Sequence, residues 1–168
     1  MFDRYSMRAR QVVMLSRWTA GMRGAEAIEL KDLLEALIRE DQGEAAAILS
    51  KGHPNIPRFT EQDDAPVPFF SKDEAPTLLA ALAKPGLGNQ DTSVDMPLAA
   101  SVKGALVAAL VLADKRPAKV VEPLHLLAVI VEDRESPLAK LLRVSGITRQ
   151  RVRRGLRKGG LLVLGEQA

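Results

Sequence analysis

Apolar residues recur at steps of three and four along most of the chain, and this spacing predicts amphipathic helices. The predicted helices cover residues 3–20, 29–40, 43–51, 98–114, 122–133, 137–144 and about 148–158. Asp3 or Ser6 can cap the first helix, and Thr148 can cap the last. Gly159 and Gly160 are expected to end the last helix, because glycine favours the turn that follows a helix. The pattern therefore predicts an all-α protein.

Residues 53–95 interrupt the helical pattern. Six prolines fall between positions 54 and 85, and glycines follow at 86 and 88. This composition is typical of a connector between packed elements. Within it, the run from Ser71 to Ala83 predicts one short capped helix. A connector of this length in a compact protein is expected to be functional or mobile.

The helical pattern occurs twice in the chain. A shift of 93 positions superposes the two halves without a gap from residue 28 to residue 50. The matching pairs are Ile28-Glu29 with Val121-Glu122, Leu33-Leu34 with Leu126-Leu127, Leu37-Ile38 with Ile130-Val131, and Ile48-Leu49 with Leu141-Leu142. Matched spacing across three helices means that each half buries the same faces against the same neighbours. We therefore predict an internal repeat rather than a chance likeness between two Leu/Ala-rich bundles.

Composition excludes several classes of site. The chain has no cysteine, so it has no disulfide framework and no thiolate metal site. Its two histidines, His53 and His125, cannot hold zinc by themselves, and we expect His125 to bond to backbone near a helix start while His53 is a solvated turn residue. No apolar run is long enough to cross a membrane, and the N-terminus lacks the apolar core of a signal peptide. A cytoplasmic location is therefore expected.

Carboxylates gather at three places along the chain, Glu40-Asp41, Asp63-Asp64 and Glu132 to Glu135. Paired acids can perform acid–base chemistry. Here no serine–histidine pair and no metal-spaced companion accompanies them, so we interpret all three as solvated surface groups. We predict no catalytic, cofactor-binding or metal-binding residue, and hence no enzyme.

The net charge of +3 is unevenly distributed. Residues 136–165 contain eight Lys/Arg and no Asp/Glu, which leaves 16 basic and 21 acidic residues elsewhere, a net charge of −5. Arg151 and Arg154 of the predicted last helix are candidate partner contacts. This helix could contact nucleic-acid phosphates, but it lacks interleaved aromatic residues. A solvated face, or contact with an acidic partner, is the interpretation that we prefer.

Three aromatic residues are candidate anchors for a protein partner, namely Trp18, Phe69 and Phe70. Trp18 can alternatively pack in the core, and the two phenylalanines can pin the connector to the bundle. We hypothesise that the groove between the two repeats, bordered by the connector, binds a peptide or an adaptor.

The opening residues Met1 to Ser6, with Ala9-Arg10 and Val12-Val13, resemble the start of Clp-family unfoldases. The second copy, Met96 through Ala113 and then His125-Leu126-Leu127, is similar to the second repeat of that family. The resemblance implies that residues 1–168 form one double Clp N-terminal domain, with about eight helices in a pseudo-twofold bundle. Its parts would be repeat 1 at about 1–52, the connector at about 53–95, repeat 2 at about 96–158 and a tail at 159–168.

In Clp unfoldases this domain sits on an ATPase ring, receives substrates and adaptors, and is not catalytic. The present sequence lacks a Gly-x-x-x-x-Gly-Lys-Ser/Thr loop, so it contains no ATPase site of that type. The alternatives are a free-standing domain and a piece of a larger chain, and the degenerate tail favours the first. The resemblance thus implies a non-catalytic interaction module of a Clp-type chaperone–protease system, without a cofactor. Its partner would be an AAA+ unfoldase, an adaptor or an unfolded substrate. The rival interpretation is a nucleic-acid-binding or regulatory protein that uses the basic C-terminal helix.

The sequence departs from the family where the second helix of each repeat begins. Relatives carry Gly-Thr-Glu-His there, and in some members the glutamate helps to receive phosphoarginine on marked substrates. The matching positions here are Lys31 and Leu124. Neither side chain can pair with a guanidinium, so we do not expect this recognition in the present chain.

Overall fold

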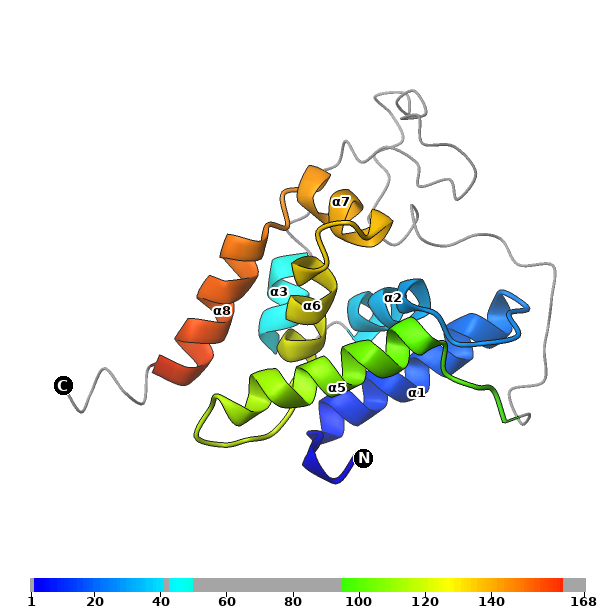
Figure 1. Cartoon of the computed structure of the whole chain (residues 1–168), viewed down its shortest axis with the longest axis horizontal. Coiled ribbons are helices and arrows are strands. Elements are labelled where there is room, and N and C mark those ends of the chain that lie inside the picture. The colour runs from blue at the N-terminus through cyan, green and yellow to red at the C-terminus, as the bar shows by residue number, and fades with distance from the viewer. Residues whose placement is uncertain (1, 41–42, 50–94, 162–168) are drawn as a thin grey trace.

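The computed structural model describes residues 2–40, 43–49 and 95–161, and most of these residues lie in helices (Figure 1). The first half contains a short 3-10 helix (Phe2–Arg4), α1 (Met7–Met22), α2 (Leu30–Glu40) and α3 (Gly43–Leu49). The second half contains α5 (Ala100–Asp114), α6 (Pro123–Glu132), α7 (Pro137–Val144) and α8 (Arg149–Leu161). The described ranges contain seven α-helices and no strand, which confirms the predicted all-α class. The short connector helix, Phe69 and Phe70 lie outside the described residues.

The first helix begins later than predicted. Phe2, Asp3 and Arg4 form the separate 3-10 helix, so Asp3 does not cap α1. Ser6 is the cap, because its hydroxyl oxygen accepts a hydrogen bond from the Ala9 backbone N–H at 3.2 Å. That bond satisfies one of the amide groups that the first turn of a helix leaves without a partner.

The prediction that Gly159 and Gly160 end the last helix was wrong, since α8 continues through both to Leu161. A glycine inside a helix costs about 1 kcal/mol relative to alanine, which is too little to end it. Glycine does follow the end of α7, where Gly146 adopts the left-handed conformation with φ of 82°.

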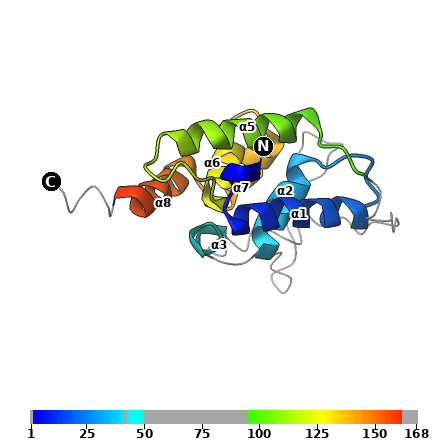
Figure 2. The same cartoon turned by 90° about the horizontal axis from the view of Figure 1, so that it is seen from below.

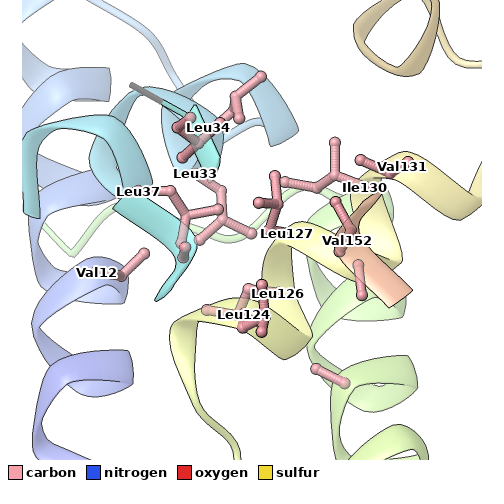
Figure 3. Packing of buried hydrophobic residues seen from close by; sticks show 14 of the residues in the cluster. Val12, Leu33, Leu34, Leu37, Leu124, Leu126, Leu127, Ile130, Val131 and Val152 are labelled. Atoms are coloured by element: carbon pink, nitrogen blue, oxygen red, sulfur yellow. The ribbon is translucent and has the colours of Figure 1, made fainter. Parts of the chain in front are cut away.

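Helix α6 lies at the centre of the bundle and packs against α5, α7 and α8 of its own half and against α1, α2 and α3 of the other. Its buried residues occur on all sides of the helix, so α6 lacks the broad polar face that a surface helix turns to solvent. Figure 3 shows Leu33 and Leu37 of α2 facing Leu127 of α6. One continuous core therefore joins the two halves.

The predicted pseudo-twofold relation is visible in two isolated parallel bridges. Tyr5 pairs with Val121, and Ile28 pairs with Leu98. Under the shift of 93, Tyr5 corresponds to Leu98 and Ile28 to Val121, so the shift exchanges the two bridges. In each half, the residues before the first helix therefore pair with the residues before the second helix of the other half.

The backbone hydrogen bonds of the two bridges obey the same relation. Val121 N–H donates to the Arg4 carbonyl at 2.8 Å, and Ile28 N–H donates to the Pro97 carbonyl at 2.9 Å. Because Arg4 and Pro97 are also 93 positions apart, the two bonds are equivalent. Figure 2 shows the result, with α1 and α5 along opposite sides of the bundle and α2 and α6 between them.

Candidate partner-binding surfaces

The solvent-facing side of α1 is largely apolar. Met7 is 85% exposed, Met14 74%, Trp18 43% and Met22 50%. With Gln11, these residues follow steps of three and four and so form one stripe along the helix, opposite the side buried in the core. Large apolar side chains at this density are depleted on surfaces that face only water. We call Met7, Gln11, Met14, Trp18 and Met22 the α1 stripe.

Trp18 was a candidate for core packing, and that alternative is wrong. The core side of α1, which packs against α2, consists largely of small buried residues such as Ala9, Ser16 and Ala20, whereas Trp18 is exposed. The Trp18 ring instead lies beneath the guanidinium of Arg39 of α2, with Arg39 Cζ 5.3 Å from the ring centroid. Arg39 is held there by Glu35, at 2.7 Å.

The equivalent face of α5 repeats the arrangement with smaller side chains. Val107 and Val111 are both exposed, and the shift of 93 places them on Met14 and Trp18. Gly104 lies on the same face and has open space around it. The two halves thus share exposed apolar positions, but only α1 carries large flexible and aromatic groups there.

The basic residues singled out in the sequence lie on α8, which packs against α6 and α3 through Val152, Gly155 and Leu156. Arg151 is half-buried and donates from Nη1 to the Gly146 carbonyl at 3.3 Å, whereas Arg154 is exposed. Helices α1 and α8 lie apart in both views (Figures 1 and 2). The structure therefore separates Trp18 from the arginines instead of joining them in one site.

One predicted surface carboxylate, Glu40, is buried. Its side chain receives Arg8 of α1, with Arg8 Nε at 2.8 Å from Oε1 and Nη2 at 3.3 Å from Oε2. The ion pair ties the start of α1 to the end of α2. Residues 32 positions apart form this pair, so sequence spacing gave no sign of it.

Glu132 is also engaged, at the junction of α6 and α8. It is within 2.6 Å of Arg149 and 2.7 Å of Arg153. Desolvation opposes its ionisation, but the hydrogen bonds and charges of the two arginines outweigh it and hold the Glu132 pKa below its usual range. Asp133 and Glu135, by contrast, are exposed as predicted.

The start of α2 contains a buried polar cluster that sequence reasoning missed. The Asp32 carboxylate accepts from the Glu29 backbone N–H at 2.8 Å and receives Arg23 at 3.1 and 2.8 Å. The Asp32 side chain is only 1% exposed. A sequence signal existed, since an Asp two residues into a helix is a common partner for the orphan amide groups. Lys31, beside it, is paired with Glu29 at 3.3 Å.

The shift of 93 places His125 on Asp32, Glu122 on Glu29 and Arg116 on Arg23. His125 makes the bond that Asp32 makes in the first repeat, since its Nδ1 accepts a hydrogen bond from the Glu122 backbone N–H at 2.9 Å. This bond confirms the prediction that His125 bonds to backbone near a helix start. Burial and then the nearby charge of Arg116 lower the His125 pKa to about 4. Among the described residues its Nε2 has no hydrogen-bond partner. Leu124, beside it, packs in the core.

No metal centre is found among the described residues, where no three His, Cys, Asp or Glu side chains converge. In the same part of the chain, no helix is both long and apolar enough to cross a membrane.

Comparison with known proteins identifies the scaffold. Residues 98–160, which span α5 to α8, match the model of the Clp repeat (R) N-terminal domain. A comparison with curated protein sequences gives no match. One similar solved structure comes from preliminary structural investigations of a malarial protein secretion system, with 16% identity, a TM-score of 0.65, and coverage of 93% of this chain and 94% of that one.

A second similar structure is the N-terminal domain of the caseinolytic protease associated chaperone ClpD from Arabidopsis thaliana. It is 16% identical with a TM-score of 0.60, and the likeness covers 95% of this chain and 97% of that one. At such identity the two likenesses establish the fold. Residues 98–160 therefore match the Clp repeat N-terminal domain family, and the chain as a whole has the fold of the N-terminal domain of ClpD.

Proposed function

We propose that this chain is a non-catalytic interaction module of a Clp-type chaperone–protease system, and that it binds apolar segments of substrates or adaptors along the α1 stripe. The domain family that it matches consists of protein-interaction modules of Clp chaperones. The observation that carries the proposal is the exposure of Met7, Met14, Trp18 and Met22 on one face of α1.

The chemistry of the stripe suits a partner of variable sequence. Methionine side chains are flexible and polarizable, so they adapt to differently shaped apolar groups. Fully burying one such side chain contributes about 1.5–3 kcal/mol relative to leaving it exposed. Trp18 adds a rigid aromatic anchor whose orientation is fixed by Arg39.

Trp18 is the single tryptophan of the chain, so its fluorescence reports directly on the stripe. Titration with a permanently unfolded, carboxymethylated protein should shift its emission to shorter wavelength as the ring leaves water. Met14→Lys should weaken this binding about tenfold, because a charge would have to be desolvated in the contact. Val144→Lys, at an exposed apolar position on α7, serves as the control and should bind as the original chain does.

Membership of a Clp system is tested separately by affinity capture with the full chain. Recovery of an AAA+ ring or its peptidase, identified by mass spectrometry, is the expected result. If neither is retained, and if Met14→Lys and Val144→Lys bind the unfolded protein equally well, both parts of the proposal are refuted.

A further inference from the structure

The outer face of α7 and α8 carries positive charge that the described residues do not neutralise. Few acidic groups lie on the elements packed against α8, and one of them, Glu132, already forms ion pairs with Arg149 and Arg153. Glu44 of α3 lies beside Gly155, on the inner side of α8. On α7, on α8 and in the loop before α7, seven basic residues have no ion pair with a described residue, namely Arg134, Lys140, Arg143, Arg151, Arg154, Arg157 and Lys158.

Two adjoining hollows give this face a shape. The first, of about 270 Å³, lies where α6, α7 and α8 meet, and Arg134, Arg143 and Arg149 surround its apolar floor of Val131 and Ala139. The second, of about 330 Å³, follows α8. Its lining residues are Arg149, Gln150, Arg153, Arg154 and Arg157. Arg149 and Gln150 line both hollows, so the two adjoin, and we call the pair of hollows the basic trough.

We propose that the basic trough binds an acidic segment of a partner protein, with carboxylates on the arginines and a small apolar side chain in the first hollow. Guanidinium groups match carboxylates with two parallel hydrogen bonds. Arg154 and Arg157 are two such groups without an ion pair, three positions apart on α8, and this favours a run of acids over a single one. The stretch from Arg149 to Arg157 is about 12 Å long, which corresponds to about four residues of extended peptide.

Nucleic acid also carries regularly spaced negative charge, but the trough lacks the means to hold bases. Proteins that bind single strands stack bases on aromatic side chains. The segment from residue 98 to residue 161 contains no Phe, Tyr or Trp, and the described aromatic residues lie in the first half of the chain. An apolar floor next to the arginines also suits a peptide side chain better than a sugar–phosphate backbone. The inference concerns a surface separate from the α1 stripe and does not depend on it.

The proposal can be tested with the full chain by fluorescence anisotropy. The probe is a labelled peptide with about four successive Glu/Asp in a Gly/Ser frame, a length matched to the trough. Its Gln/Asn analogue and a labelled oligothymidylate of the same net charge are the comparison ligands. Arg154→Ala/Arg157→Ala removes two unpaired, exposed charges of the trough. Lys103→Ala/Lys115→Ala removes two exposed charges, one on α5 and one directly after it, as a charge-matched control.

We expect the acidic peptide to bind at least about tenfold more tightly than its amide analogue. Arg154→Ala/Arg157→Ala should weaken binding by about tenfold, and the control pair by less than about twofold. Equal losses in both double variants would show a mere effect of net charge and overturn the proposal. Tighter binding of the oligothymidylate than of the acidic peptide would also overturn it, in favour of a nucleic-acid surface.

Discussion

His125 should make the stability of this fold depend on pH between about 6.5 and 4. In the folded chain its Nδ1 accepts a hydrogen bond from Glu122 N–H, its side chain is buried, and the Arg116 charge is close. A protonated ring has no acceptor nitrogen, so protonation would break the cap as well as bury a charge. The folded state therefore resists a proton that the unfolded state accepts.

The sign and size follow from the two pKa values. The ordinary histidine pKa of 6.5 falls to about 4 in the folded chain. Above pH 6.5 neither state binds the proton, and the contribution of His125 to stability is complete. As the pH falls from 6.5 towards 4, only the unfolded state is protonated, so stability is lost across that window. At 1.36 kcal/mol per pKa unit, the loss reaches about 2 kcal/mol at pH 5 and about 3 kcal/mol at pH 4.

His125→Asn isolates this effect, because its side-chain carbonyl can still accept from Glu122 N–H but does not titrate. Asp32 shows that a shorter side chain makes this bond in the first repeat. We expect the variant to be less stable at pH 7 by about 1–2 kcal/mol, from the lost ring volume. Between pH 7 and pH 5 the original chain should lose about 2 kcal/mol more than the variant does.

Urea unfolding followed by circular dichroism at a series of pH values measures the free energy of unfolding directly. The chain has only two histidines, so the NMR titration of the ring protons, with His53→Asn to assign them, gives an independent pKa. Parallel stability curves for the original chain and His125→Asn would refute the reasoning. So would a His125 resonance that titrates near 6.5.

Two further contrasts use paired positions. Gly155→Ala should destabilise by about 1 kcal/mol, because the new Cβ would lie 3.0 Å from Ile48 Cδ1, whereas Gly104→Ala should stabilise by about 0.5–1 kcal/mol, since nothing lies within 4 Å. Arg23→Ala should cost about 3 kcal/mol by leaving the buried Asp32 carboxylate unpaired, whereas Arg4→Ala, in an exposed pair, should cost less than about 1 kcal/mol. Thermal and urea unfolding of all four variants measure both contrasts, and a reversed order within either pair contradicts it.

Periodicity predicted the helices well because each one buries a face at regular steps. In α5 and α7 the apolar residues at this spacing, such as Val102, Leu106 and Leu142, are buried. Periodicity served α1 less well, since apolar residues lie on both its core side and its solvent side. No pattern in one helix says which apolar side finds a neighbour, so the position of Trp18 required the packing of α2.

Polar contacts between residues far apart in the sequence were the main features that the sequence did not predict. The pairing of Arg8 with Glu40 and of Arg23 with Asp32 depends on how α1 and α2 cross, which single-helix spacing does not encode. The internal repeat held the missing information for one of them. Because His125 is expected to bond to backbone, the shift of 93 could have predicted the same backbone bond for Asp32.

The two halves show which features the scaffold requires and which it leaves free. Both keep an arginine after the first helix, at Arg23 and Arg116, and both keep a side-chain acceptor for the amide that begins the second helix. These positions serve the fold, so a residue may change from Asp to His only if it still accepts that bond. The exposed positions have no such constraint, and at one of them Trp18 of the first half aligns with Val111 of the second. Because the equivalent exposed position of the second half carries a valine, the scaffold does not require a large apolar group there, and a bound partner is the physical reason that we infer for those on α1.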